Sequence, residues 1–86
     1  MNSFTSRRFR EMLASLPSEV QARARRAYRL FRQNPSHPSL NFKKVNDQDN
    51  IYSARVGLGH RVLGQLDGEE IVWFWIGAHD EYDKLL

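Results

Sequence analysis

A proline-bracketed loop, Asn34-Pro35-Ser36-His37-Pro38-Ser39, divides the chain into two parts with different hydrophobic periods. Neither proline can lie inside a helix, because its ring removes an amide hydrogen and clashes with the preceding turn. Before the loop, apolar residues recur every three or four positions, which is typical of helices; after it they alternate, which is typical of strands. Because 86 residues have room for one hydrophobic core, we expect a single α+β domain over residues 1–86.

The part before the loop predicts two helices joined by a tight turn, an N-terminal helical hairpin. We expect Ser6 to cap the first helix and Pro17 to end it, with Pro17 in the first turn of the second helix. The apolar stripe of the first helix is Phe9, Met12, Leu13 and Leu16, and that of the second is Val20, Ala24, Ala27 and Phe31.

The part after the loop predicts a small antiparallel sheet of three or four strands, at residues 40–45, 51–56, 60–66 and 71–76. Residues 2–5 are too short a pattern to decide on a further strand, and residues 79–86 predict a short C-terminal helix. Because two helices cover only one face of a sheet, we expect the other face to stay open to water or a partner. The alternation of the second strand points Arg55 toward that face.

The pairing of the last two strands depends on the turn at Asp67-Gly68. If this turn has two residues, Val62 pairs with Trp73 and His60 with Trp75. Both tryptophans then lie on one face of the sheet among aliphatic residues, as parts of the core. A turn of three residues would reverse the faces.

Positive charge is concentrated in residues 1–45, which hold ten basic and two acidic residues, a net charge of +8. Residues 46–86 hold three basic and eight acidic residues, a net charge of −5. On the second helix, Arg25, Arg29 and Arg32 fall opposite the apolar stripe. Such a surface is either an ordinary solvated face or a surface for a polyanion or an acidic partner, and charge alone favours the solvated face.

Several classes of site are excluded by what the sequence lacks. The absence of cysteine excludes disulfides, thiolate metal sites and a cysteine nucleophile. The histidines, at 37, 60 and 79, have no metal-ligand spacing, and no nucleophile elbow or phosphate-cradling glycine loop is present. No apolar run is long enough to span a membrane, and the polar N-terminus has no signal peptide. We therefore expect a cytoplasmic protein that uses no metal or cofactor.

Four residues are expected to meet on the open face and at its C-terminal edge: Arg55, Arg61, His79 and Tyr82. Cations beside a histidine suit the cleavage of RNA without a metal ion. A base takes the proton of the ribose 2′-OH, the oxygen attacks the adjacent phosphate, and an acid protonates the leaving 5′ oxygen. The arginines stabilise the charge on the phosphoryl oxygens, and the tyrosine stacks on a base or takes part in proton transfer.

Each of these residues also has a purely structural interpretation. Arg61 could pair with Glu70 across the hairpin, His79 could cap the last helix, and Tyr82 could pack through its ring. Lys43 and Lys44 are either solvated or in contact with backbone phosphates.

Three segments carry a resemblance to a known family: Tyr52-Ser53-Ala54-Arg55-Val56-Gly57, Gly59-His60-Arg61-Val62-Leu63-Gly64 and Ile71-Val72-Trp73-Phe74-Trp75-Ile76-Gly77-Ala78-His79-Asp80-Glu81-Tyr82. Together with Phe42-Lys43-Lys44-Val45, they resemble the RelE/ParE superfamily, the toxins of type II toxin–antitoxin modules, over almost the whole chain. The resemblance implies a microbial-ribonuclease-like fold and a cognate antitoxin. It also implies one of two activities: RelE-like members cleave messenger RNA, often on the ribosome, whereas ParE-like members poison DNA gyrase.

Only some of the site residues of RelE-like enzymes are matched in this sequence. RelE-like enzymes present two basic residues on the strand that holds Arg55, and Ser53 departs from that pattern. The basic residue of the next strand is matched by Arg61. RelE-like enzymes also have an arginine and a tyrosine near the C-terminus. The arginine corresponds here to His79, a better acid–base group near neutral pH. The tyrosine corresponds to Tyr82, with shorter spacing.

The leading prediction is therefore a metal-independent mRNA endoribonuclease that inhibits translation. The alternatives are a ParE-like inhibitor of DNA gyrase and a non-toxic scaffold that binds an antitoxin. The residues expected to contact RNA outside the catalytic group are Lys43, Lys44, Arg25, Arg29 and Arg32. The arginine-rich helix has a competing use, since guanidinium–carboxylate pairs could bind acidic antitoxin segments.

Overall fold

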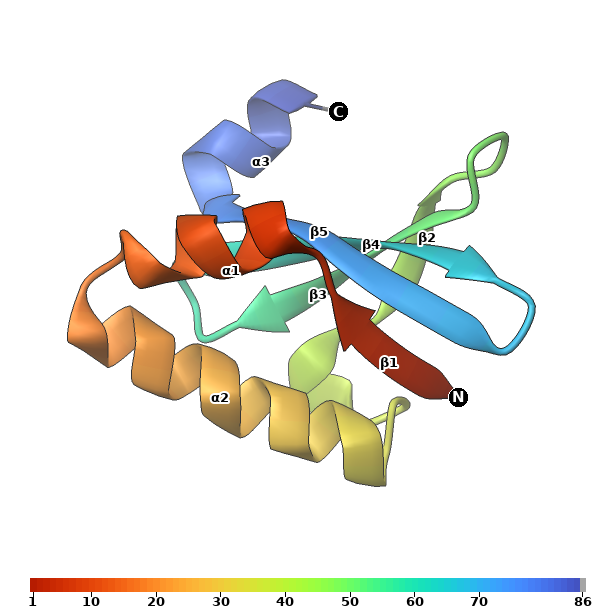
Figure 1. Ribbon diagram of the computed structural model, residues 1–86, viewed down its shortest axis with the longest axis horizontal. Helices are drawn as coiled ribbons and strands as arrows, with labels where there is room; N and C mark the ends of the chain where they lie inside the picture. Colours follow the sequence, from red (N-terminus) through yellow and green to blue (C-terminus); the bar gives the residue numbers. More distant parts are fainter. Residues whose placement is uncertain (86) are drawn as a thin grey trace.

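The proline-bracketed loop separates a helical hairpin from most of a sheet in the computed structural model, which describes residues 1–85. A short strand precedes the hairpin and a short helix follows the sheet (Figure 1). The elements are β1 (Asn2–Thr5), α1 (Arg7–Ala14), α2 (Ser18–Gln33), the 3-10 helix η1 (Pro38–Leu40), β2 (Lys43–Asn46), β3 (Ile51–Val56), β4 (His60–Asp67), β5 (Glu70–Ala78) and α3 (His79–Leu85). Among these residues, no helix has the length and apolarity needed to cross a membrane.

The sheet has five strands in the order β1-β5-β4-β3-β2 and is mixed, because β1 pairs with β5 in parallel. The expectation of three or four antiparallel strands is therefore wrong. The short β1 is held by contacts that come from distant parts of the chain. The hydroxyl of Tyr28 donates to the Ser3 carbonyl at 3.1 Å, and Trp73 Nε1 donates to Ser3 Oγ at 3.0 Å.

The first strand after the proline loop begins later than predicted. Residues 38–40 form a 3-10 turn that places Leu40 in the core, where it is 2% exposed. Asn41 then adopts a left-handed conformation with φ of 45°, and β2 begins at Lys43. A buried leucine in a turn gives the same apolar signal as a strand residue, which is why periodicity alone placed the strand at residue 40.

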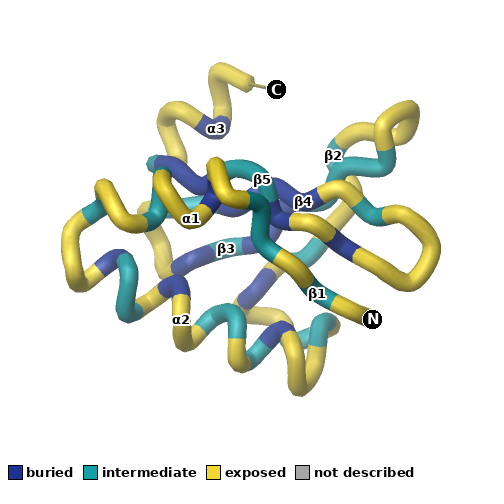
Figure 2. Tube along the Cα trace, viewed as in Figure 1, coloured by how far each residue is buried: buried dark blue, intermediate teal, exposed yellow. Residues whose placement is uncertain are grey.

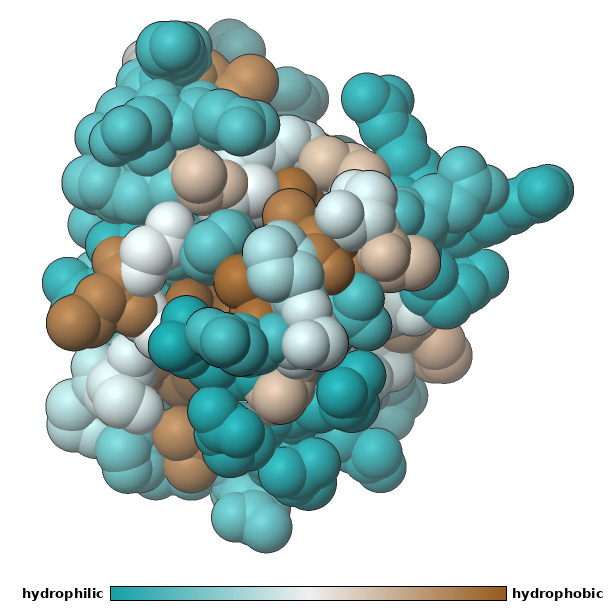
Figure 3. All heavy atoms as spheres, turned by 90° about the vertical axis from the view of Figure 1, so that its left-hand side faces the viewer, coloured by the Kyte–Doolittle hydropathy of each residue, from teal (hydrophilic) through white to brown (hydrophobic). Residues whose placement is uncertain are grey.

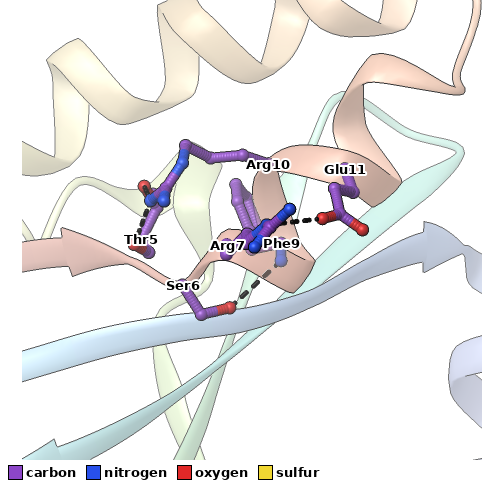
Figure 4. Close-up of polar contacts among 6 residues, drawn as sticks. All are labelled: Thr5, Ser6, Arg7, Phe9, Arg10 and Glu11. Carbon is purple, nitrogen blue, oxygen red and sulfur yellow. Dashed lines mark hydrogen bonds and ion pairs between the residues drawn. The ribbon is translucent and has the colours of Figure 1, made fainter.

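The expected cap of the first helix is confirmed. Ser6 Oγ accepts a hydrogen bond from the Phe9 amide at 3.0 Å (Figure 4). The same close-up shows an exposed pair between Arg7 and Glu11, and Arg10 reaching back to Thr5. These contacts fix α1 to the end of β1.

The hydrophobic core lies between the helical hairpin and one face of the sheet. Buried segments follow β3, β4 and β5 and the inner sides of α1 and α2 (Figure 2). Phe31 packs edge-to-face on Trp73, with ring centroids 5.3 Å apart. The apolar stripes predicted for the two helices therefore face the sheet. The helices contribute Phe9, Ala24 and Phe31 to the buried core, and Met12, Leu13, Leu16 and Ala27 pack against it.

The predicted register of the last two strands is wrong. Asp67 pairs with Glu70 across Gly68-Glu69, and the pairing shifts by one residue between Leu63 and Gly64. Val62 therefore pairs with Ile76 and not with Trp73. This β-bulge places the two tryptophans on opposite faces of the sheet, since Trp73 pairs with Gly64 on the core side and Trp75 with Leu63 on the other.

The second face of the sheet is not fully open. Helix α3 folds back from the end of β5 (Figure 1) and contacts β4 and β5. Tyr82, on this helix, is 7% exposed and belongs to the buried set. The expectation of an uncovered face is thus corrected: a short helix covers part of it, and the last residue of the predicted helix, Leu86, lies outside the described residues.

Candidate functional site

A pocket of about 230 Å³ lies on the sheet face that α3 partly covers. All four residues expected to form a catalytic group line it, together with Lys43 from the edge strand β2. Among residues 1–85, the lining is Asn41, Lys43, Ser53, Ala54, Arg55, Arg61, His79, Tyr82 and Asp83. The residues come from the loop before β2, from three neighbouring strands and from α3, so only the folded chain assembles this pocket.

Arg55 and Arg61 lie directly opposite each other in the pairing of β3 and β4. Like charges at directly opposite positions destabilise a sheet unless another charge compensates them. Neither guanidinium forms an ion pair with a carboxylate among residues 1–85. Arg55 Nε is buried and has no hydrogen-bond partner in the described part of the chain, and Arg61 donates to the carbonyl of His60 at 2.9 Å. The pair therefore concentrates positive charge that a bound anion would neutralise.

The alternative interpretation of Arg61 as a partner of Glu70 does not hold. In the pairing of β4 and β5, Arg61 is opposite Gly77, whereas Glu70 is opposite Asp67 at the far end of the hairpin. Arg61 is therefore held at the pocket by its own strand and by a main-chain carbonyl.

His79 begins α3 and stands at the rim of the pocket. Its amide donates to the Gly59 carbonyl at 2.9 Å, which attaches the start of the helix to the β3–β4 hairpin. Its Nε2 lies 3.5 Å from Asp83 Oδ2, and 47% of the histidine side chain is exposed. Asp83 thus orients an imidazole that solvent and a ligand can reach. Asp83 was not among the predicted residues, although its i+4 spacing from His79 on an expected helix was a signal for it.

Tyr82 has a buried hydroxyl. It donates to Ser53 Oγ at 3.2 Å, and Ser53 is itself only 2% exposed. The phenol ring lies beside the imidazole of His79, with ring centroids 6.5 Å apart and an interplanar angle of 20°. This geometry favours Tyr82 as a support for His79 over a surface for stacking RNA bases. Ser53, the position that departs from the basic pattern, supplies the partner for this hydroxyl, a contact across 29 residues that no local pattern indicated.

Of the cations predicted outside the catalytic group, Lys43 lines this pocket, whereas Lys44, Arg25, Arg29 and Arg32 do not. Lys43 and Lys44 occupy opposite faces of β2, since Lys43 pairs with Ser53 and Lys44 with Tyr52. Lys44 Nζ lies 5.7 Å from the ring centroid of Tyr52 on the helix side. Arg32 lies over the ring of Tyr28, with its guanidinium carbon 6.0 Å from the centroid.

Arg25 and Arg29 belong to a different cavity, about 300 Å³ in volume, between the helical hairpin and the core face of the sheet. Most of its lining is apolar and includes Phe9, Phe31 and Trp73. Figure 3 shows one side of the molecule, where apolar atoms lie in a recess surrounded by hydrophilic side chains. Arg55 lines both this cavity and the pocket that holds His79.

No group of three or more histidine and acidic side chains suited to hold a metal ion occurs within residues 1–85. The charged and titratable side chains that line the pocket include two arginines, a lysine and a histidine with its carboxylate partner. These groups can bind an anion and exchange a proton beside it.

Comparisons with known proteins agree with this fold. A family model described as the ParE-like toxin domain matches residues 18–84. The RelB–RelE antitoxin–toxin complex from Methanococcus jannaschii contains a chain that is 18% identical, with a TM-score of 0.74 over 96% of this chain and 98% of that chain. YafQ from Escherichia coli is 10% identical, with a TM-score of 0.73 over 94% and 96% of the two chains.

A third similar structure is the toxin–antitoxin complex RelBE2 from Mycobacterium tuberculosis. The matching chain is 20% identical, with a TM-score of 0.69 over 91% of this chain and 96% of that chain. A search of curated proteins finds no match. At sequence identities of 10–20%, the structural similarity shows that these chains share a fold.

Proposed function

Because the chain belongs to the ParE-like toxin domain family, within the RelE/ParE superfamily of toxins of toxin–antitoxin modules, we propose that it is a metal-independent endoribonuclease that cleaves messenger RNA and inhibits translation. The observation that carries this proposal is the arginine pair. Arg55 and Arg61 lie directly opposite each other beside His79 in one pocket, without a carboxylate partner among the described residues.

The proposed reaction needs an anion site and a group that exchanges protons. Arg55 and Arg61 bind the non-bridging oxygens of the phosphate and stabilise the charge that grows on them. His79 takes the proton from the ribose 2′-OH, and the 2′ oxygen attacks phosphorus. The bond between phosphorus and the 5′ oxygen breaks, and the proton held by His79 passes to that oxygen. The products are a 2′,3′-cyclic phosphate and a 5′-hydroxyl.

Two further residues have supporting roles in this proposal. Lys43 lies on the edge strand beside the pocket and contacts a neighbouring phosphate. Tyr82, fixed by Ser53, holds the first turn of α3 and so the position of His79. Asp83 orients the imidazole through its contact with Nε2.

The proposed partner of the toxin is a cognate antitoxin. Two of the similar structures are complexes of a toxin with its antitoxin, which supports this proposal. Helix α2 exposes Arg25 and Arg29 at the apolar cavity and Arg32 further along, a surface with the charge to meet either acidic antitoxin segments or ribosomal RNA.

The proposal is tested by expression of the chain with and without the antitoxin from the adjacent gene, followed by RNA cleavage with purified protein and ribosomes in EDTA. We expect growth arrest and RNA breaks with the wild type and neither with the double variant Arg61→Ala/His79→Ala. The matched controls are Arg26→Ala, on the exposed side of α2, and His37→Asn, in the loop before η1; both retain activity. Cleavage that persists in the double variant would refute the assignment of the site.

Inhibition of DNA gyrase without catalysis is the second candidate, favoured by the ParE-like description of the matching family. It predicts induction of the DNA-damage response and trapped gyrase–DNA complexes, with messenger RNA left intact. Absence of any growth defect in the same experiment would instead favour a scaffold that only binds its antitoxin.

A further inference from the structure

The bulge in β5 turns Trp75 toward the face that holds the arginine pair. Trp73 and Trp75 are two residues apart, and in a regular strand they would share a face. The register shift places Trp73 in the core at 3% exposure and leaves Trp75 half-buried on the opposite face. Bulges re-aim side chains next to functional sites. Here the bulge adds a large aromatic ring to the surface that carries Arg55 and Arg61.

The indole of Trp75 extends along the sheet toward Arg61. A Cβ atom on Gly77 would lie 2.5 Å from Trp75 Cζ2 and 2.6 Å from Cη2, so the six-membered ring covers this glycine. Gly77 is the register partner of Arg61. Because neighbouring strands are about 4.8 Å apart, the ring lies close to an anion bound at Arg61.

A groove of about 430 Å³ begins at this ring and crosses the same face of the sheet. Its apolar lining includes Leu63, Phe74 and Trp75, and its polar lining includes Arg8 and Asn46. Leu63 is the next outward residue after Arg61 on β4, about 7 Å along the strand. The groove therefore lies next to the arginine pair along β4, and the two pockets share no lining residue within residues 1–85. Its volume is in the range of pockets that bind small molecules, and none of the acidic residues up to position 85 lines it.

We propose that this groove is a nucleobase subsite, in which the base next to the cleaved phosphate stacks on Trp75 beside Phe74. The inference rests on the proposed ribonuclease function and assigns the part of the substrate that the arginine pair does not hold. Stacking on an aromatic ring accepts any base, so Trp75 supplies affinity. Asn46 and Arg8 can bind the edges of the base, because the amide group of Asn46 has donors left after its oxygen accepts from the Asp49 amide.

The test measures the binding of a short 2′-O-methylated RNA, which lacks the nucleophile and cannot be cleaved. Trp73 and Trp75 are the two tryptophans of the chain, and Trp73 is buried. We expect the RNA to quench tryptophan fluorescence in the wild type and to leave the emission of Trp75→Phe unchanged. Trp75→Leu should bind a labelled copy of the RNA about tenfold more weakly, measured by fluorescence anisotropy. An abasic strand of the same length should bind wild type and Trp75→Leu equally.

Phe4→Leu is the matched control, because Phe4 is an exposed aromatic residue on β1 and does not line the groove, the arginine pocket or the apolar cavity. It should bind the RNA as the wild type does, and circular dichroism melting checks that each variant is folded. Binding that depends on Arg55 and Arg61 but neither quenches Trp75 nor weakens in Trp75→Leu would overturn the base subsite and leave the proposed function intact. If neither the wild type nor any variant bound the RNA, both the base subsite and the proposed function would be overturned.

A second copy of the chain is the competing occupant of the groove. Emission from Trp75 that changes with protein concentration in the absence of RNA, together with a dimer in sedimentation, would assign the groove to self-association and overturn the proposal.

Discussion

At the scale of single residues, the site combines two arginines that repel each other with a histidine that a carboxylate orients. Arg55 and Arg61 are cross-strand neighbours, and a sheet selected for stability alone would place an uncharged or acidic residue at one of the two positions. The buried, unpartnered Nε of Arg55 is a second cost of the same kind. Both costs fall when an anion binds.

Removal of one charge should therefore increase stability while it lowers activity. For Arg55→Met we expect a free energy of unfolding that is higher by about 0.5 kcal/mol at low salt. RNA cleavage should fall about 100-fold, because one donor to the phosphate is lost. Sulfate should raise the melting temperature of the wild type more than that of the variant. Equal stabilisation of both proteins by sulfate would show that the anion does not bind at this pair.

The hydroxyl of Tyr82 should contribute to stability more than to chemistry. Tyr82→Phe removes its hydrogen bond to Ser53 and should cost about 1 kcal/mol of unfolding free energy. Cleavage should fall less than tenfold, since the ring that supports His79 remains. The matched Ser53→Ala variant should behave in the same way. A loss of activity in Tyr82→Phe as large as in His79→Ala would instead place this hydroxyl in proton transfer.

At the scale of the elements, the sheet depends on close packing where β4 and β5 meet. Gly64 lies on β4, beside the core side chains of β5. A Cβ at this position would come within 2.7 Å of the Trp73 ring and 2.9 Å of Ile71. Gly64 pairs with Trp73 beside the bulge. A side chain at this position would force apart the core packing that keeps Trp73 buried.

Gly64→Ala should therefore lower the free energy of unfolding by about 1–3 kcal/mol, the usual cost of overpacking. Gly59→Ala is the control, because a Cβ on Gly59 has no atom within 4 Å. Its stability should stay within about 0.5 kcal/mol of the wild type. Urea denaturation measures both. Equal effects of the two substitutions would contradict the described packing.

Much of this arrangement follows from local patterns, and the rest depends on distant contacts. The alternation of β3 predicted both its bounds and the outward direction of Arg55, because both are properties of one strand. The bulge at Phe74 could not be predicted, since it depends on how Trp73 fits over Gly64. For the same reason, the pattern of residues 2–5 could not decide whether β1 forms, and the Tyr82–Ser53 contact was not predicted: each joins residues that are far apart in the chain.

At the scale of the whole molecule, positive charge is divided between two sides of the sheet. Lys43 lies with the arginine pair, whereas Lys44 lies on the helix side with Tyr52. Arg25 and Arg29 also lie on the helix side, at the apolar cavity. In the proposed function, RNA binds on the side of the arginine pair and an acidic partner binds on the helix side.

The two lysines should therefore differ in their effect on RNA binding. For Lys43→Ala we expect the slope of the logarithm of affinity against the logarithm of salt concentration to fall by about 0.7, the value for one phosphate contact on a single strand. Lys44→Ala should leave the slope unchanged. Filter binding of a 2′-O-methylated RNA at several salt concentrations measures both slopes. A larger effect of Lys44 would place the RNA on the helix side.

In the proposed reaction, the pocket promotes attack of a ribose 2′ oxygen on the adjacent phosphate. The decisive experiment digests, in EDTA, a ribosome-bound messenger RNA that carries a single 2′-deoxynucleotide at the cleaved position. Mass spectrometry identifies the ends formed from the unmodified substrate. We expect a 2′,3′-cyclic phosphate from the unmodified RNA and no cleavage at the deoxynucleotide. Cleavage that continues at the deoxynucleotide, or intact RNA beside trapped gyrase–DNA complexes, would rule out this reaction.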